Sequence, residues 1–123
     1  MNLPGKSQKL IKKAVSWARK RGFVKIKANI ENENFETPAS FVKPGEKKPY
    51  VPDVTGMKFG RKNYIEIALK TENVRRTISK WKLLSTLANM KNGKLFLLAP
   101  RGHKAFARTI VKERNLNAKV IGI

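Results

Sequence analysis

The sequence predicts a single α/β domain in which helices flank a mixed central sheet, in the order α-β-β-β-α-β-α-β. Two observations predict this class. Amphipathic stretches with helical spacing alternate with short strand-like runs, and Gly, Asn or Pro residues separate them. A chain of 123 residues with 41% apolar content encloses one core and leaves little room for a second domain. We therefore expect residues 1–123 to form one unit.

The first helix is expected over residues 6–21, where apolar residues lie on one side of the helix and basic residues on the opposite side. Gly22 is well placed to end this helix. A basic amphipathic helix also suits an anionic membrane surface. An apolar face that leads into a strand more often covers a sheet, which is the role we expect. Residues 23–30 alternate as a half-buried strand does, with Lys25 and Lys27 facing solvent or a ligand. The expected core row is Val24, Ile26, Ala28 and Ile30.

A loop or irregular hairpin is expected over residues 31–49, which are rich in Pro and Glu. Residues 51–57 and 62–70 then predict two paired strands, joined by a turn at residues 59–61.

The second half of the chain alternates helices and strands. A helix is expected over 77–91, ended by Asn92-Gly93, and the continuous apolar run 95–99 is typical of an interior strand. A last helix to about residue 115 and a short strand over 118–123 complete the predicted order.

The charge predicts the class of partner. Lys and Arg number 28 against 8 Asp and Glu, which gives a formal net charge of +20 and a pI near 10.7. Such an excess favours polyanions, and nucleic acid is the commonest inside cells. The alternative, charge kept only for solubility, is less favoured because this much self-repulsion destabilises a small fold.

Composition also limits the metals and the compartment. The chain has no cysteine and one histidine, so a bound metal must be held by oxygen ligands, which points to Mg²⁺ or Mn²⁺. No run approaches the ~18 apolar residues needed to cross a bilayer, and the first residues do not resemble a secretory signal. We expect an intracellular, nucleoid-associated protein of the cytoplasm that does not bind membranes.

A candidate catalytic site comes from the two paired strands. Side chains alternate along 64–70, so Glu66 and Lys70 share a face, and Asp53 joins them if the strands pair. Asp53 and Glu66 would hold Mg²⁺ beside a phosphate, and Lys70 would orient a water or stabilise the developing charge. The alternative is that Glu66 and Lys70 form an ordinary cross-strand surface pair.

The expected helix 77–91 places Lys80 on the same side as its apolar residues Leu83, Leu84, Leu87 and Met90. A lysine there reaches the rim of the core or meets an anion, so Lys80 is a candidate phosphate contact. The alternative is a lysine that lies along the helix surface, and Trp81 is expected to pack rather than to stack on a base.

The Pro52-Asp53 pair, the run Leu69-Lys70-Thr71-Glu72 and the element order resemble the PD-(D/E)xK nucleases, especially the small Holliday-junction-resolvase and VRR-type branches. The resemblance implies a restriction-endonuclease-like core, Mg²⁺-dependent cleavage of branched, flap or junction DNA, and a homodimer. It makes Asp53 the metal-binding aspartate and Lys70 the motif lysine.

The chain departs from the family pattern at two places. Ala68 stands where an acid is expected two positions before the lysine, and residues 6–21 contain no acid. Three explanations stay open: a migrated carboxylate such as Glu66, an engineered inactivating change, or a natural relative that binds without cutting. The alternative function is therefore a non-catalytic nucleic-acid-binding protein, either on an inactivated nuclease scaffold or as a basic nucleoid- or ribosome-associated module.

Further nucleic-acid contacts are expected around this site, with DNA favoured over RNA. The segment 101–104 lies at a helix start, where free N–H groups favour phosphate, and phosphate contact is preferred there over proton transfer by the histidine. The complete set of expected contacts is Lys80, Arg75, Arg76, Arg101, His103, Lys104, Lys25 and Lys27.

Overall fold

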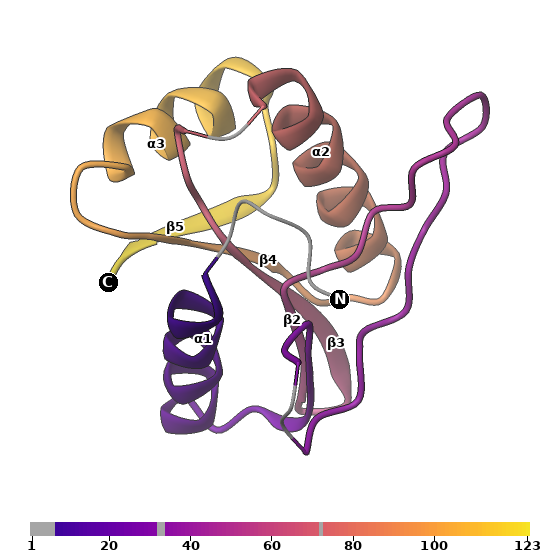
Figure 1. The fold of residues 1–123 in the computed structure, drawn as a ribbon, viewed down its shortest axis with the longest axis vertical. Helices are drawn as coiled ribbons and strands as arrows, with labels where there is room; N and C mark the ends of the chain where they lie inside the picture. Colours follow the sequence, from indigo (N-terminus) through magenta and orange to yellow (C-terminus); the bar gives the residue numbers. More distant parts are fainter. Residues whose placement is uncertain (1–6, 32–33, 72) are drawn as a thin grey trace.

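The computed structural model describes residues 7–31, 34–71 and 73–123 (Figure 1). Within them lie three helices and five strands in the predicted order. The elements are α1 (Gln8–Lys20), β1 (Val24–Ala28), β2 (Val54–Lys58), β3 (Arg61–Ile67), α2 (Val74–Met90), β4 (Leu95–Ala99), α3 (Lys104–Glu113) and β5 (Ala118–Gly122). Lys6, at the expected helix start, and Glu72, in the run quoted above, lie outside the described residues.

The sheet is mixed, as predicted, with the strand order β1-β2-β3-β4-β5. β1, β2 and β3 are antiparallel neighbours, whereas β3, β4 and β5 run parallel. The connections explain the change. A tight turn with positive φ at Phe59 and Gly60 joins β2 to β3, and parallel strands need crossover helices, which α2 and α3 supply.

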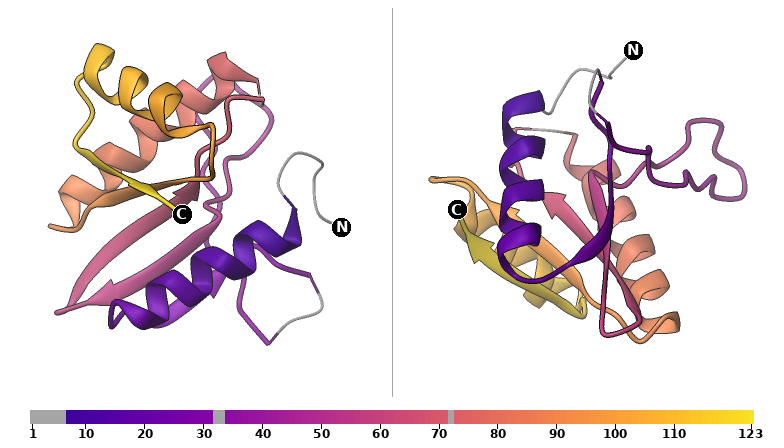
Figure 2. Two further views of the ribbon diagram at one scale, coloured as in Figure 1. Left: turned by 90° about the vertical axis from the view of Figure 1, so that its left-hand side faces the viewer. Right: turned by 90° about the horizontal axis from the view of Figure 1, so that it is seen from below.

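Helices cover both faces of the sheet, with α1 on one face and α2 and α3 on the other (Figure 2). The central strand β3 serves both layers because its side chains alternate. Ile65 and Ile67 pack under α1, while Tyr64 and Ala68 pack with Trp81 of α2. The predicted sheet-covering role of the first helix is confirmed.

The expected core row of β1 is wrong at Val24, whose exposed fraction is 58%. Lys25 has a φ of 51°, and the pairing with β2 is irregular between Val24 and Lys27. This bulge interrupts the alternation, so a neighbouring side chain takes the inward position. Phe23 is buried instead, against Trp17 and Phe96.

The buried side of α2 also differs from the prediction. Met90 is 71% exposed, whereas the buried positions are Trp81, Leu84, Ser85 and Ala88. The helix is therefore rotated slightly from the expected leucine stripe. Trp81, which is 1% exposed, packs in the core as expected.

Residues 41–50, here called the arm, leave the domain beside α2 and form the magenta projection in Figure 1. The expected irregular hairpin is confirmed by an isolated bridge between Phe41 and Tyr50, whose backbones exchange hydrogen bonds of 2.8 and 2.7 Å. Phe41 packs edge-on against Tyr64 of β3. The arm is thus tied to the same face of the sheet as α2.

In the part of the chain that the structure describes, no helix is long and apolar enough to cross a membrane.

Candidate active site

The pairing of β2 with β3 brings Asp53 and Glu66 together. Val54 lies opposite Ile65, so Asp53, one residue before β2, lies level with Glu66. The Asp53 N–H donates to Glu66 Oε2 at 2.6 Å, and the Ile67 N–H donates to Asp53 Oδ2 at 2.9 Å. Backbone donors therefore orient both carboxylates. The two acids are neighbours, as the sequence predicted if the strands paired.

Lys80 supplies a positive charge to this pair. Its Nζ lies 2.9 Å from Glu66 Oε1 and 3.8 Å from Asp53 Oδ1. Each carboxylate thus presents one oxygen to a backbone N–H and the other to the same ammonium. Glu66 is 0% exposed and Asp53 3%, whereas the Lys80 side chain keeps 17% of its surface exposed. The lysine is the member of the cluster that reaches towards solvent.

The packing of α2 positions Lys80. The helix begins after Asn73, whose Oδ1 accepts from the Arg76 N–H at 3.1 Å. Trp81 and Leu84 are anchored in the core and set the rotation of the helix about its axis. Lys80, next to Trp81, is therefore held over the acids at the end of β3.

Lys70 lies apart from this cluster. It is exposed beyond the end of β3, and its backbone N–H donates to His103 Nδ1 at 3.0 Å. Among the described residues, no ion pair or hydrogen bond joins the Lys70 side chain to Asp53 or Glu66. The ammonium in contact with the acids is that of Lys80, which the sequence indicated as a phosphate contact rather than as part of the catalytic set.

Ala68 is 0% exposed and packs in the core with Trp81. A carboxylate at this position would be buried against an aromatic ring at a large cost. Glu66, two residues earlier on the same face, already contacts Asp53. The second acid of the cluster is therefore Glu66, and Ala68 is a core residue.

Asp53 and Glu66 are the side chains of this cluster that could hold a divalent metal ion. Among the described residues, no group of three or more His, Asp or Glu side chains is arranged to hold a metal ion. Mg²⁺ is commonly held by one or two carboxylates together with phosphate oxygens and waters. Asp53 Oδ1 and Glu66 Oε1 both face one cation, the Lys80 ammonium.

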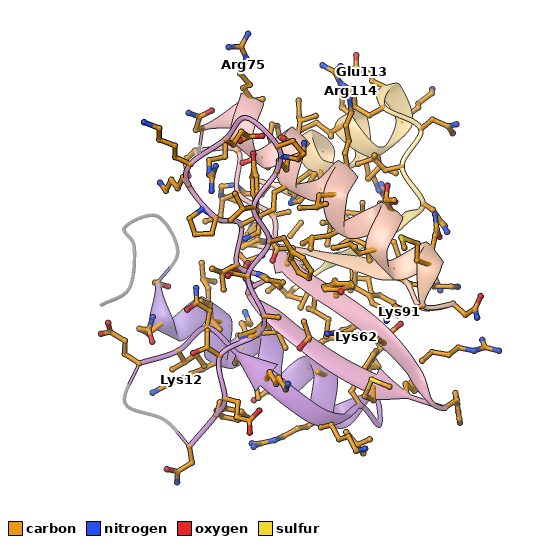
Figure 3. All side chains as sticks on the ribbon, turned by 90° about the vertical axis from the view of Figure 1, so that its right-hand side faces the viewer. Lys12, Lys62, Arg75, Lys91, Glu113 and Arg114 are labelled. Carbon is orange, nitrogen blue, oxygen red and sulfur yellow. The ribbon has the colours of Figure 1, made fainter. Side chains whose placement is uncertain are left out.

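Arg76 binds the arm rather than standing in solvent. Its guanidinium stacks over the Tyr50 ring at 3.9 Å and donates to the Pro49 carbonyl at 2.6 Å. It also lies 3.8 Å from Glu46. Arg75, the neighbouring expected contact, is exposed at the start of α2 (Figure 3).

Sequence reasoning missed the contact between the arm and α2. The Tyr50 hydroxyl donates to Glu46 Oε1 at 2.7 Å and lies 3.1 Å from Ser79 Oγ, which accepts from Lys43 Nζ at 2.6 Å. Tyr50 lies three residues before Asp53, and Ser79 precedes Lys80. The arm is thus fastened directly beside the acid cluster. An aromatic residue between prolines in an otherwise polar loop was the available signal.

The other expected contacts lie on several surfaces. Arg101 and Lys104 are exposed around the start of α3, and His103 is half-buried there. Lys25 is exposed on the bulge of β1, and Lys27 lies 3.5 Å from Glu36.

Comparisons with family models, with curated proteins and with solved structures found no match for this chain.

Proposed function

We propose that the protein is a metal-dependent endonuclease that hydrolyses DNA phosphodiesters at Asp53, Glu66 and Lys80. The observation that carries the proposal is the convergence of two buried carboxylates and one partly exposed lysine in a strongly basic domain. Buried ion clusters contribute little net stability compared with apolar packing, so they are functional-site candidates when they face a ligand.

Each residue has a role that follows from its position. Asp53 and Glu66 would hold Mg²⁺ or Mn²⁺, with their orientation set by backbone N–H groups. The bound ion would neutralise the phosphate and lower the pKa of a water molecule. Lys80, with its partly exposed ammonium, would stabilise negative charge that develops on the phosphate.

The element order and the mixed sheet support a restriction-endonuclease-like core, and the acids lie where its first paired strands meet. In the resemblance to PD-(D/E)xK nucleases, Pro52-Asp53 is then the first half of the motif and Glu66-Ile67-Ala68 the second half. Ala68 occupies the lysine position of the motif, two residues before Lys70. Lys80 of α2 replaces the lysine absent at Ala68. Branched, flap or junction DNA, a homodimer and an intracellular, nucleoid-associated location follow from the same resemblance and belong to this proposal.

A non-catalytic nucleic-acid-binding protein is the second candidate. This non-catalytic role is favoured by Ala68, which stands at the position of the motif lysine. In this case Lys80 serves only to neutralise the two buried acids. The net charge of +20 supports nucleic-acid binding in both cases.

Cleavage of plasmid and branched DNA in Mg²⁺ or Mn²⁺ separates the two candidates. We expect Asp53→Asn, Glu66→Gln and Lys80→Met each to reduce cleavage by about 100-fold or more, the range of electrostatic groups that act in the transition state. Lys70→Ala is the matched control and keeps most of the activity. Cleavage that survives the first three changes, or that fails only in Lys70→Ala, would contradict the assignment. Wild-type protein that binds but never cuts would favour the second candidate.

A further inference from the structure

A second cationic site lies on the same face of the sheet as the acid cluster. Lys62 of β3 shares this face with Tyr64 and Glu66, because side chains two residues apart point the same way. Lys62 and Glu66 are four positions apart in the sequence, which corresponds to about 13 Å along the strand. The lysine is half-buried, and its ammonium lies 5.6 Å from the centre of the Tyr64 ring.

Gly93 explains why a second lysine lies beside Lys62. A Cβ at this glycine would come within 1.7 Å of the Lys62 carbonyl oxygen, so the turn after α2 passes directly against the β3 backbone. This close approach carries Lys91, two residues earlier, to the side of Lys62 (Figure 3). No residue with a side chain fits there without moving the turn.

A third lysine comes from β1. Lys27 lies opposite Thr55, which in turn lies opposite Tyr64. Directly paired residues of antiparallel strands project to the same face, so Lys27 shares the face of Tyr64 and Lys62. We call Lys27, Lys62 and Lys91 the lysine cluster; its members come from β1, β3 and the turn after α2.

Two of the three lysines in this cluster have no nearby acid among the described residues. Lys27 has Glu36 at 3.5 Å, but among the described residues no carboxylate pairs with Lys62 or Lys91. Burial lowers the pKa of Lys62 from its ordinary value, and the charges of Lys27 and Lys91 lower it further. A lowered pKa means that the charged form costs stability at neutral pH, and the cost is relieved as the pH rises above the folded-state pKa.

We propose that the lysine cluster binds a backbone phosphate of the nucleic acid, on the strand whose scissile phosphate lies at Asp53 and Glu66. A bound phosphate would offset the repulsion among three ammonium groups. The separation of about 13 Å along β3 spans a few nucleotides, so one strand reaches both places. The position of the scissile phosphate rests on the proposed nuclease function, whereas phosphate binding by the cluster does not.

The test compares Lys62→Met with Lys13→Met, which removes the same charge from an exposed site on α1, on the opposite face of the sheet. Binding of a fluorescent DNA duplex is measured by anisotropy in EDTA over a range of salt concentrations. We expect Lys62→Met to weaken binding about five- to ten-fold and to lower the salt slope by about one unit. Lys13→Met should change the affinity by less than about two-fold, as a contact outside the interface does.

Thermal unfolding without DNA gives a second readout. Lys62→Met removes a poorly solvated charge, so its melting temperature should exceed that of Lys13→Met. Weaker binding together with higher stability distinguishes a ligand site from a structural lysine. Equal affinities of the two variants, or weaker binding that accompanies a loss of stability, would overturn the proposal.

Neutral methylphosphonate groups placed one at a time along the DNA locate the contact. At one position the substitution should weaken wild-type binding but leave Lys62→Met unaffected. Absence of such a position would overturn the phosphate contact even if the enzyme cuts. If the position is found and no cleavage occurs with Mg²⁺, the cluster stands and the nuclease function alone fails.

Discussion

Replacing Lys80 with methionine removes the positive charge between the two buried acids while keeping the length of the side chain. The ammonium lies 2.9 Å from Glu66 Oε1 and 3.8 Å from Asp53 Oδ1. At an effective dielectric constant of about 20, the shorter pair alone corresponds to about 6 kcal/mol of Coulomb attraction. Desolvation of the lysine offsets part of this, and breaking a buried pair typically costs about 3–5 kcal/mol.

For a domain of this size, that loss lowers the melting temperature by about 12–20 °C, at roughly 4 °C for each kcal/mol. Thermal unfolding in EDTA measures the effect. Lys82→Met is the matched control because Lys82 is exposed on the same helix. We expect the control to remain within about 2 °C of the wild type, as surface changes do.

Mg²⁺ adds a readout specific to the acid cluster. If Asp53 and Glu66 bind the ion, removal of the competing ammonium leaves a stronger site, and Mg²⁺ should raise the melting temperature of Lys80→Met more than that of the wild type. A free Mg²⁺ concentration of ten times the dissociation constant adds about 1.4 kcal/mol to the free energy of unfolding. The reasoning would be refuted if Lys80→Met melted at the same temperature as the Lys82→Met control. It would also be refuted if Mg²⁺ left the melting temperature of Lys80→Met unchanged.

Three other expectations follow from particular contacts. Moving the lysine back to the strand, as Ala68→Lys in the Lys80→Ala background, should recover part of the cleavage lost in Lys80→Ala; a double variant that folds but cuts no better would contradict the shifted motif. Gly93→Ala should lower the free energy of unfolding in urea by about 3 kcal/mol or more, because its Cβ would overlap the Lys62 carbonyl, and a neutral effect would show that the turn moves easily. Arg76→Gln removes the stacking on Tyr50 and should speed hydrogen exchange at the Tyr50 N–H; unchanged exchange would mean that the arm is held by its other contacts.

Much of the fold was predictable because its signals are local. The order of helices and strands follows from periodicities within ten to twenty residues, and the structure reproduces it with shifts of a few residues at the ends. The misplaced side chains have local causes that periodicity does not encode. Val24 is exposed because Lys25 adopts a positive φ, and Met90 is exposed because Trp81 sets the rotation of α2.

The candidate site was predictable in part. Asp53 and Glu66 are neighbours because a short turn joins β2 and β3, so their register follows from the sequence between them. The lysine that contacts the acids, Lys80, was not predictable from strand alternation. Lys70 shares the alternating pattern with Glu66, but β3 ends at Ile67, and the chain beyond it is drawn towards α3 by the hydrogen bond to His103.

By itself, the amino-acid sequence determined the α/β class, the covering role of α1, an excess of positive charge suited to a polyanion, and the pairing of two acids on adjacent strands. Only the tertiary structure decided which ammonium meets those acids, where the arm is fastened, and that Lys27, Lys62 and Lys91 gather. The physical reason is separation along the chain. Local patterns set which face a residue takes, whereas contacts between distant elements depend on how α2 is rotated and on how closely Gly93 lets its turn approach β3.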